Sequence, residues 1–184
     1  MMIFADAKRA LRHFVQDTRG TAAVETVIIL PFLFWAFLAT YVYFDAYKQR
    51  SLSVKAAYTI GDLISRETQG ITDGYIDTMH DLAGFLNKHG NRPTMRITVA
   101  MWDEEDNAYK LDWSEARGGA TALSNDGINA MADQLPTLPD NERIIVVETW
   151  STATPVFDVG LNESVIYNLS FTSPRFAPQV AWAD

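Results

Sequence analysis

The longest uninterrupted apolar stretch lies near the N-terminus. Nineteen consecutive residues, 26–44, carry no charged side chain, and Glu25 is the only charged residue between positions 22 and 44. At a rise of about 1.5 Å per residue, the stretch would form a helix of roughly 28 Å, close to the ~30 Å hydrocarbon thickness of a bilayer. The pattern therefore predicts a membrane-spanning helix over about 22–44.

The helical periodicity continues beyond this stretch. Apolar residues recur at i, i+4 and i+8 from Leu52 to Ile60, which predicts one helix over about 21–66. Pro31 has no N–H for the carbonyl oxygen of Val27, so we expect a local kink there. Gly61 lowers the helix propensity and is expected to weaken the helix near its end.

The remaining residues, 67–184, predict a small domain of mixed α and β structure. One helix is expected from Thr72 or Asp73 to Lys88, and a shorter one after Ser124 or Asn125. Segments rich in β-forming residues predict four strands, over 95–102, 109–113, 144–151 and 165–171. The fold class is therefore α+β: a long N-terminal helix, then an antiparallel sheet with two or three short helices.

Charge and composition restrict the function. The chain of 184 residues has a formal net charge of −8 and no cysteine, which excludes disulfides and thiolate metal sites. Residues 1–20 carry a net charge of +2, so their removal would leave −10. An acidic chain argues against nucleic-acid binding. The basic N-terminal residues favour a cytoplasmic N-terminus, although three basic residues also follow the apolar stretch at 48–55.

A cleaved secretory signal peptide is an alternative for this N-terminus. Its apolar core would span about 7–15 residues and end near a small-residue cleavage site. Here the apolar stretch is longer and ends in the bulky sequence at 40–44, which is typical of the aromatic belt at a membrane surface. The pattern favours a retained membrane helix.

The residues at the start of this helix resemble a prepilin processing site. A basic leader ends in Arg19 and Gly20, Thr21 follows, and Glu25 is the fifth residue after the Gly20–Thr21 bond. With the apolar helix that follows, this resembles type IV prepilins, and specifically the TadE/TadG-like pseudopilins of tight-adherence (Flp-type) pilus systems. The segment at 144–157 is similar to one near the C-terminus of those proteins.

The resemblance implies a minor or initiating pseudopilin that is cleaved after Gly20 by a prepilin peptidase. Residues 67–184 would then be periplasmic and anchored in the inner membrane, and incorporation of the subunit into a surface pilus is left open. The implied partners are the prepilin peptidase, other pilins and pseudopilins, the inner-membrane pilus platform and the lipid bilayer. A major subunit is not expected, because Flp-type major pilins are very small.

Glu25 is the residue to which the resemblance gives the clearest role. A carboxylate deep in a bilayer costs on the order of 2.5–3.5 kcal/mol on insertion scales, so it needs a partner. The new α-amino group of Thr21, with a pKa of about 7.7–8.0 in peptides, would supply one in the same subunit or a neighbouring one. The alternative is that Glu25 lies at the headgroup boundary and is simply hydrated.

Signatures of enzymes and metal sites are weak. Asp77, His80 and Asp81 share one face of an expected helix, but a solvated polar face gives the same pattern. The acidic run at 103–106 lacks the ligand spacing of an EF-hand loop, and a solvated turn is favoured. We therefore expect no enzyme activity, no cofactor and no metal. Core packing is the favoured role of three tryptophans: Trp102, Trp113 and Trp150.

Two further functional classes stay open. The main alternative is an unprocessed single-pass inner-membrane anchor that presents a periplasmic binding or sensor domain. A membrane-tethered enzyme is the third. The length of the chain after expression with a prepilin peptidase would separate the pseudopilin from the static anchor.

Overall fold

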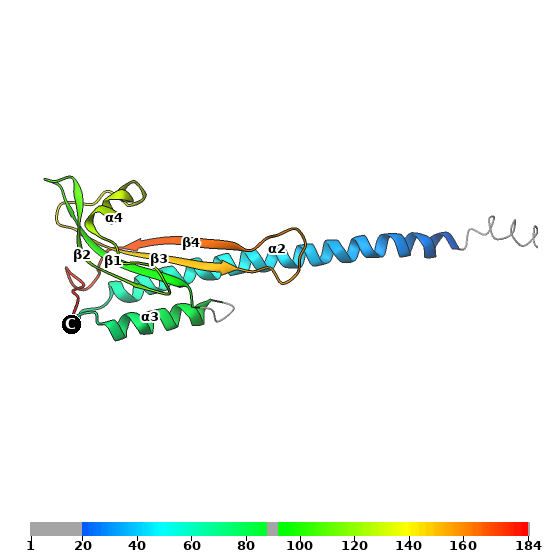
Figure 1. The fold of residues 1–184 in the computed structure, drawn as a ribbon, viewed down its shortest axis with the longest axis horizontal. Coiled ribbons are helices and arrows are strands. Elements are labelled where there is room, and N and C mark those ends of the chain that lie inside the picture. The colour runs from blue at the N-terminus through cyan, green and yellow to red at the C-terminus, as the bar shows by residue number, and fades with distance from the viewer. Residues whose placement is uncertain (1–19, 88–91, 184) are drawn as a thin grey trace, which may run out of the picture.

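The computed structural model describes residues 20–87 and 92–183, and it has the predicted α+β layout (Figure 1). Its elements are, in order, α2 (Thr21–Ser65), α3 (Asp73–Leu86), β1 (Thr94–Asp103), β2 (Ala108–Arg117), α4 (Asn125–Ala130), the 3-10 helix η2 (Ala132–Gln134), β3 (Arg143–Ala153) and β4 (Ser164–Thr172). The long helix α2 extends far beyond the domain, which is built around the opposite half of the same helix.

The four strands form one antiparallel sheet in the order β2-β1-β3-β4. The two central strands are the most apolar, and they pair with Val99 opposite Ile145. Strand β2 is longer than predicted, because Ser114 to Arg117 pair with Thr98 to Met95 of β1. Residues 114–117 have little β propensity of their own, so pairing with an apolar neighbouring strand decides their conformation.

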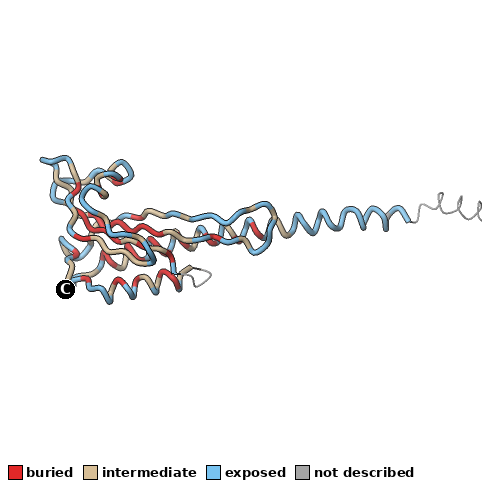
Figure 2. Tube along the Cα trace, in the orientation of Figure 1, coloured by how far each residue is buried: buried red, intermediate tan, exposed pale blue. Residues whose placement is uncertain are grey.

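The second half of α2 packs on β3 and β4, with α3 beside it (Figures 1 and 2). The core on this side of the sheet consists of Ile60, Ile64, Ile71, Ile76, Met79, Ala83, Met95, Ile97, Val99, Trp113, Ile145, Val147 and Val180. Gly61 does not interrupt α2, and the weakening expected from its low helix propensity stays a prediction. It is buried where α2 crosses the sheet, and the helix continues past it to Ser65.

A smaller core lies on the other face of the sheet, under α4 and η2. It consists of Ala100, Tyr109, Ile128, Met131, Leu135, Ile144 and Val146. Ser124 caps α4 by accepting a hydrogen bond from the backbone N–H of Gly127, at 3.2 Å. Thr72 caps α3 in the same way through the N–H of Tyr75. Both caps agree with the sequence. Helix α3 ends at Leu86, and Lys88, its predicted end, lies outside the described residues.

The C-terminal tail closes the end of the domain far from the exposed half of α2. Ile71 and Trp182 form a parallel bridge, with the Ile71 N–H donating to the carbonyl of Ala181 at 2.8 Å. The indole N–H of Trp113 donates to the carbonyl of Val180 at 2.7 Å. The tail thus packs on the end of the sheet that lies away from the exposed half of α2.

Candidate functional site

The exposed half of α2 is a large unpaired apolar surface. Between Thr21 and Tyr41 the helix has no buried residue among those described. Its exposed large apolar side chains are Val24, Val27, Ile28, Ile29, Leu30, Phe32, Leu33, Phe34, Trp35, Phe37 and Tyr41. Large contiguous patches of this kind mark a membrane or a partner protein. Within the described residues, α2 is the one helix long and apolar enough to cross a membrane, which is compatible with membrane anchoring.

The length of this surface matches a bilayer. The exposed stretch from Thr21 to Tyr41 has 21 residues, about 31 Å of helix, against a hydrocarbon thickness of about 30 Å. The sequence predicted a span over about 22–44. In the structure Val42 is only 1% exposed, so protein covers one side of the helix within the predicted span.

Glu25 lies exposed on the second turn of α2. Thr21 stands four residues before it and Ile29 four residues after it, so the three share one face of the helix. Glu25, Ile29 and Leu33 help to line a shallow groove of about 340 Å³ along that face. Among the described residues, no lysine or arginine forms an ion pair with Glu25. The arrangement presents one carboxylate on an apolar face, where a cation could pair with it.

Gly20 occupies the N-cap position of α2, with no side-chain cap for the helix. Its φ of −80° is accessible to any residue, and a Cβ built on it meets no atom within 4 Å. The fold therefore does not require glycine at position 20. Thr21 is the first residue of the helix, and Arg19 lies outside the described residues.

Pro31 lies inside α2, and the helix continues on both sides of it. Its ring leaves the carbonyl of Val27 without a helical N–H donor. In a membrane such a carbonyl is satisfied by neighbouring helices or polar side chains. The kink at Pro31 stays a prediction.

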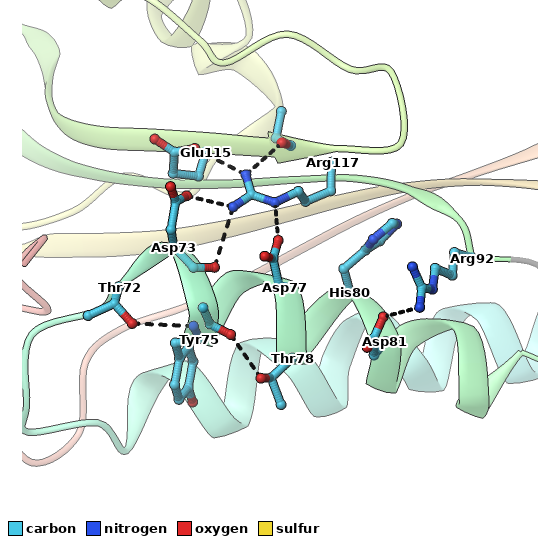
Figure 3. Close-up of polar contacts among 12 residues, drawn as sticks. Thr72, Asp73, Tyr75, Asp77, Thr78, His80, Asp81, Arg92, Glu115 and Arg117 are labelled. Atoms are coloured by element: carbon cyan, nitrogen blue, oxygen red, sulfur yellow. Dashed lines mark hydrogen bonds and ion pairs between the residues drawn. The ribbon is translucent and has the colours of Figure 1, made fainter. Parts of the chain in front are cut away.

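The polar face of α3 is held to β2, as Figure 3 shows. Asp77, His80 and Asp81 of α3 were weak candidates for a metal site, but each side chain already has a partner. Asp77 pairs with Arg117, His80 is hydrogen-bonded to the carbonyl oxygen of Pro93, and Asp81 pairs with Arg92. No group of three possible metal ligands occurs among the described residues. This face contributes to the packing of α3 on the sheet.

The acidic run at 103–106 begins at the last residue of β1 and continues into the turn 104–107 before β2, where the sequence predicted a solvated turn. Asp103 accepts a hydrogen bond from the backbone N–H of Asp106 at 2.9 Å, and it forms an ion pair with Lys110. The hydrogen bond from Lys110 holds the pKa of Asp103 below its ordinary value, and the backbone N–H of Asp106 adds to this. The Asp103 carboxylate thus has both of these partners within the β1–β2 hairpin.

The aromatic side chains are divided between core and surface. Trp113 is buried and Trp102 packs on Tyr109 with ring centroids 4.9 Å apart. Trp150 is half-buried, between the Arg96 guanidinium at 5.3 Å and the Tyr167 ring at 5.4 Å.

A buried charge lies next to Trp150. Glu148 is 3% exposed, and it pairs with Arg96 at 2.7 Å and accepts a hydrogen bond from the Tyr167 hydroxyl at 3.0 Å. Burial raises the pKa of Tyr167 to about 12, and the neighbouring Glu148 carboxylate adds to this. Removal of Arg96 would leave the Glu148 charge buried without its counter-charge, which is strongly destabilising.

From the sequence, residues 154–157 belonged to a segment of family resemblance, but no role was assigned to the loop between β3 and β4, residues 154–163. The structure places it against α2 beside the exposed half of the helix, where it meets Tyr43 and Tyr47 around one cavity. The sequence does contain a signal that could have identified this loop as unusual. Val156, Phe157 and Leu161 are apolar, although polar residues are usual in loops.

Searches against protein-family models, curated proteins and solved structures find no match to this chain.

Proposed function

We propose that this chain is a pseudopilin-like, non-enzymatic subunit of a bacterial tight-adherence pilus system, cleaved between Gly20 and Thr21. The observation that carries the proposal is the junction at the start of α2: glycine, then an exposed apolar helix of membrane length with one carboxylate at its fifth residue. The resemblance to TadE/TadG-like pseudopilins rests on these residues. The domain on the second half of α2 suits a minor or initiating subunit.

The geometry supports a particular role for Glu25. Cleavage would create a cation on Thr21, one helical turn from the Glu25 carboxylate on the same face. At low dielectric, opposite charges at this separation attract far more strongly than in water. A neighbouring subunit with the same residues would offer a second cation, so that pairing between subunits fixes the axial register of two helices.

Gly20 separates a processing role from a structural one. Because a Cβ at position 20 meets no neighbouring atom, Gly20→Ala should leave the fold unchanged. If a prepilin peptidase recognises this glycine, the same substitution should abolish cleavage. The intact mass and N-terminal sequence of the membrane-extracted protein, from cells with and without the cognate peptidase, test this directly.

A peptidase-dependent start at Thr21, lost in Gly20→Ala, is the expected result. A chain that keeps its original N-terminus in both strains would instead favour the static inner-membrane anchor. A start beyond residue 40 would mean a secreted protein and would contradict both.

A further inference from the structure

The loop between β3 and β4, residues 154–163, reaches farther along α2 than any other described part of the domain (Figure 1). It borders a cavity of about 570 Å³ between the helix and the sheet. Tyr43, Tyr47 and Arg50 line this cavity from α2, and Pro155 and Leu161 line it from the loop. The loop therefore lies at the level where the exposed apolar helix meets the domain.

The length of the helix sets the depth of this loop in a bilayer. Val42 lies 17 residues after Glu25, about 26 Å along the helix. The hydrocarbon core is about 30 Å thick, and about 40–45 Å with the headgroups. Val42 is already covered by protein. If α2 crosses the bilayer, the end of the domain at Val42 lies among lipid headgroups and not in bulk water.

The loop has side chains suited to that environment. Val156 is 50% exposed and Phe157 is 47% exposed, although they lie in a loop. The adjacent turns of α2 carry exposed aromatic residues at the same level: Tyr41, Tyr43, Phe44 and Tyr47. Tyrosine is one of the two residue types enriched at membrane–water interfaces.

Charged groups near the loop are compatible with a lipid surface. Lys48 and Arg50 are exposed on the next turn of α2, and Arg50 forms no ion pair with any described residue. Both can approach lipid phosphates. The two acidic residues of the loop are hydrogen-bonded within it: Asp158 accepts from the N–H of Gly160, and Glu163 accepts from the hydroxyl of Thr154, each at 3.3 Å.

We propose that this loop is a second membrane contact, with Val156 and Phe157 inserted into the bilayer interface of the leaflet from which α2 emerges. The partner is the lipid bilayer itself. The contact holds the domain against the membrane surface at a fixed height and limits its tilt. A subunit that leaves the bilayer has to expose or rebury these side chains. The inference rests on α2 crossing the membrane, and it is independent of cleavage at Gly20.

The absence of cysteine makes a direct test simple, because one introduced cysteine is labelled alone. The full-length protein with Phe157→Cys is spin-labelled and reconstituted into vesicles of phosphatidylethanolamine and phosphatidylglycerol. Collision rates are measured with oxygen, which concentrates in lipid, and with a water-soluble nickel chelate. Val156→Cys provides a second position in the loop, and a native urea midpoint verifies that each labelled variant is folded.

Two matched controls define the scale. Phe34→Cys lies in the exposed half of α2, and Phe176→Cys is a 67% exposed site near the end of α2, where Arg175 bonds to Ser65. We expect labels at 156 and 157 to have oxygen and nickel collision rates between those of Phe34→Cys and Phe176→Cys, as for a position in the bilayer interface. Labels that match Phe176→Cys, while Phe34→Cys remains in lipid, would overturn the loop contact alone. If Phe34→Cys is also in water, the membrane crossing fails too.

Discussion

Asn168 on β4 donates a hydrogen bond from its side-chain amide to the hydroxyl oxygen of Ser53 on α2, with nitrogen and oxygen 2.8 Å apart. The Ser53 oxygen also lies 3.0 Å from that of Ser151 on β3, and Asn168 donates to Thr149 at 3.2 Å. Ser53 is only 2% exposed. These bonds join segments that are 98 and 115 residues apart in sequence, and they fix the position of α2 along the sheet.

Ser53→Ala should loosen this junction. It leaves polar groups of Asn168 and Ser151 with fewer partners at a buried position, so we expect the unfolding free energy to fall by about 1–3 kcal/mol. Urea unfolding in detergent micelles, followed by tryptophan fluorescence, measures it. Thr59→Ala is the control, because that exposed hydroxyl bonds only to the carbonyl of Lys55 within the helix. Equal effects of the two substitutions would contradict the role of Ser53.

Arg117 links α3 to the edge strand β2. It donates to Asp73 and Asp77, each at 2.6 Å, and to Glu115 at 3.3 Å. Arg117→Met keeps the apolar stem but removes the charge, and should destabilise the domain by about 1–2 kcal/mol, because the carboxylates are exposed and can be hydrated. Amide hydrogen exchange should accelerate first in α3.

Arg92→Met provides the comparison for Arg117. Its partner Asp81 lies on the same helix α3, but both side chains of that pair are more than half exposed, so its loss should change stability by less than about 1 kcal/mol. Similar hydrogen exchange of α3 in the two variants would show that Arg117 does not position the helix.

Stability should decrease at alkaline pH. Burial raises the pKa of Tyr167 to about 12, and burial together with Glu67 raises that of Tyr75 to about 12, against 10.0 in an ordinary tyrosine. Between these values the unfolded chain has lost protons that the folded chain keeps, so the unfolding free energy falls as pH rises. Their contribution is complete below about pH 10.

The urea midpoint, measured between about pH 9 and pH 12, reports this loss. The Tyr75→Phe and Tyr167→Phe double variant should have a flatter profile, because neither position can then ionise. Tyr58→Phe, at an exposed site on α2, should leave the slope unchanged. A wild-type profile with no alkaline decrease would exclude this linkage.

Gly61 is a site for stabilisation. A Cβ at this position would lie 3.7 Å from the nearest side-chain atoms of Thr172 and Val147, which is ordinary van der Waals contact. Gly61→Ala should therefore raise the unfolding free energy by about 0.5–1 kcal/mol through helix propensity. Gly70→Ala should do the reverse, because its Cβ would lie 2.5 Å from that of Ala183. Thermal unfolding of the two variants would reveal opposite shifts.

Glu25→Gln tests the proposed pairing of subunits. The side chain stays similar in size and exposed, so processing at Gly20 should continue, as the intact mass would show. Assembly should fall about tenfold or more, since a loss of 1.4 kcal/mol per contact is a factor of ten. Glu25→Asp keeps the charge and should retain part of the function. A normal number of pili with Glu25→Gln would exclude the pairing.

Local sequence signals predicted much of the fold because they depend on neighbours in the chain. The caps Thr72 and Ser124 each bind an N–H three residues ahead. Three strands were found within two residues of their observed ends, whereas β2 extends four residues beyond its predicted end. The same holds for the start of the candidate site: Gly20, Thr21 and Glu25 lie within two turns of one helix, so their spacing alone places them together.

Only the tertiary structure decided the contacts between distant segments. Gly61 reads as a weak point in sequence, yet it lies where α2 crosses β3 and β4. The β3–β4 loop reads as an ordinary connection, yet it lies beside Tyr43 on α2, about 110 residues earlier. The sequence by itself determined that a helix of membrane length begins after Gly20, with Glu25 as its one charged residue up to position 44. Tertiary packing decided where protein begins to cover it, because that depends on sheet order and on hydrogen bonds such as Asn168 to Ser53.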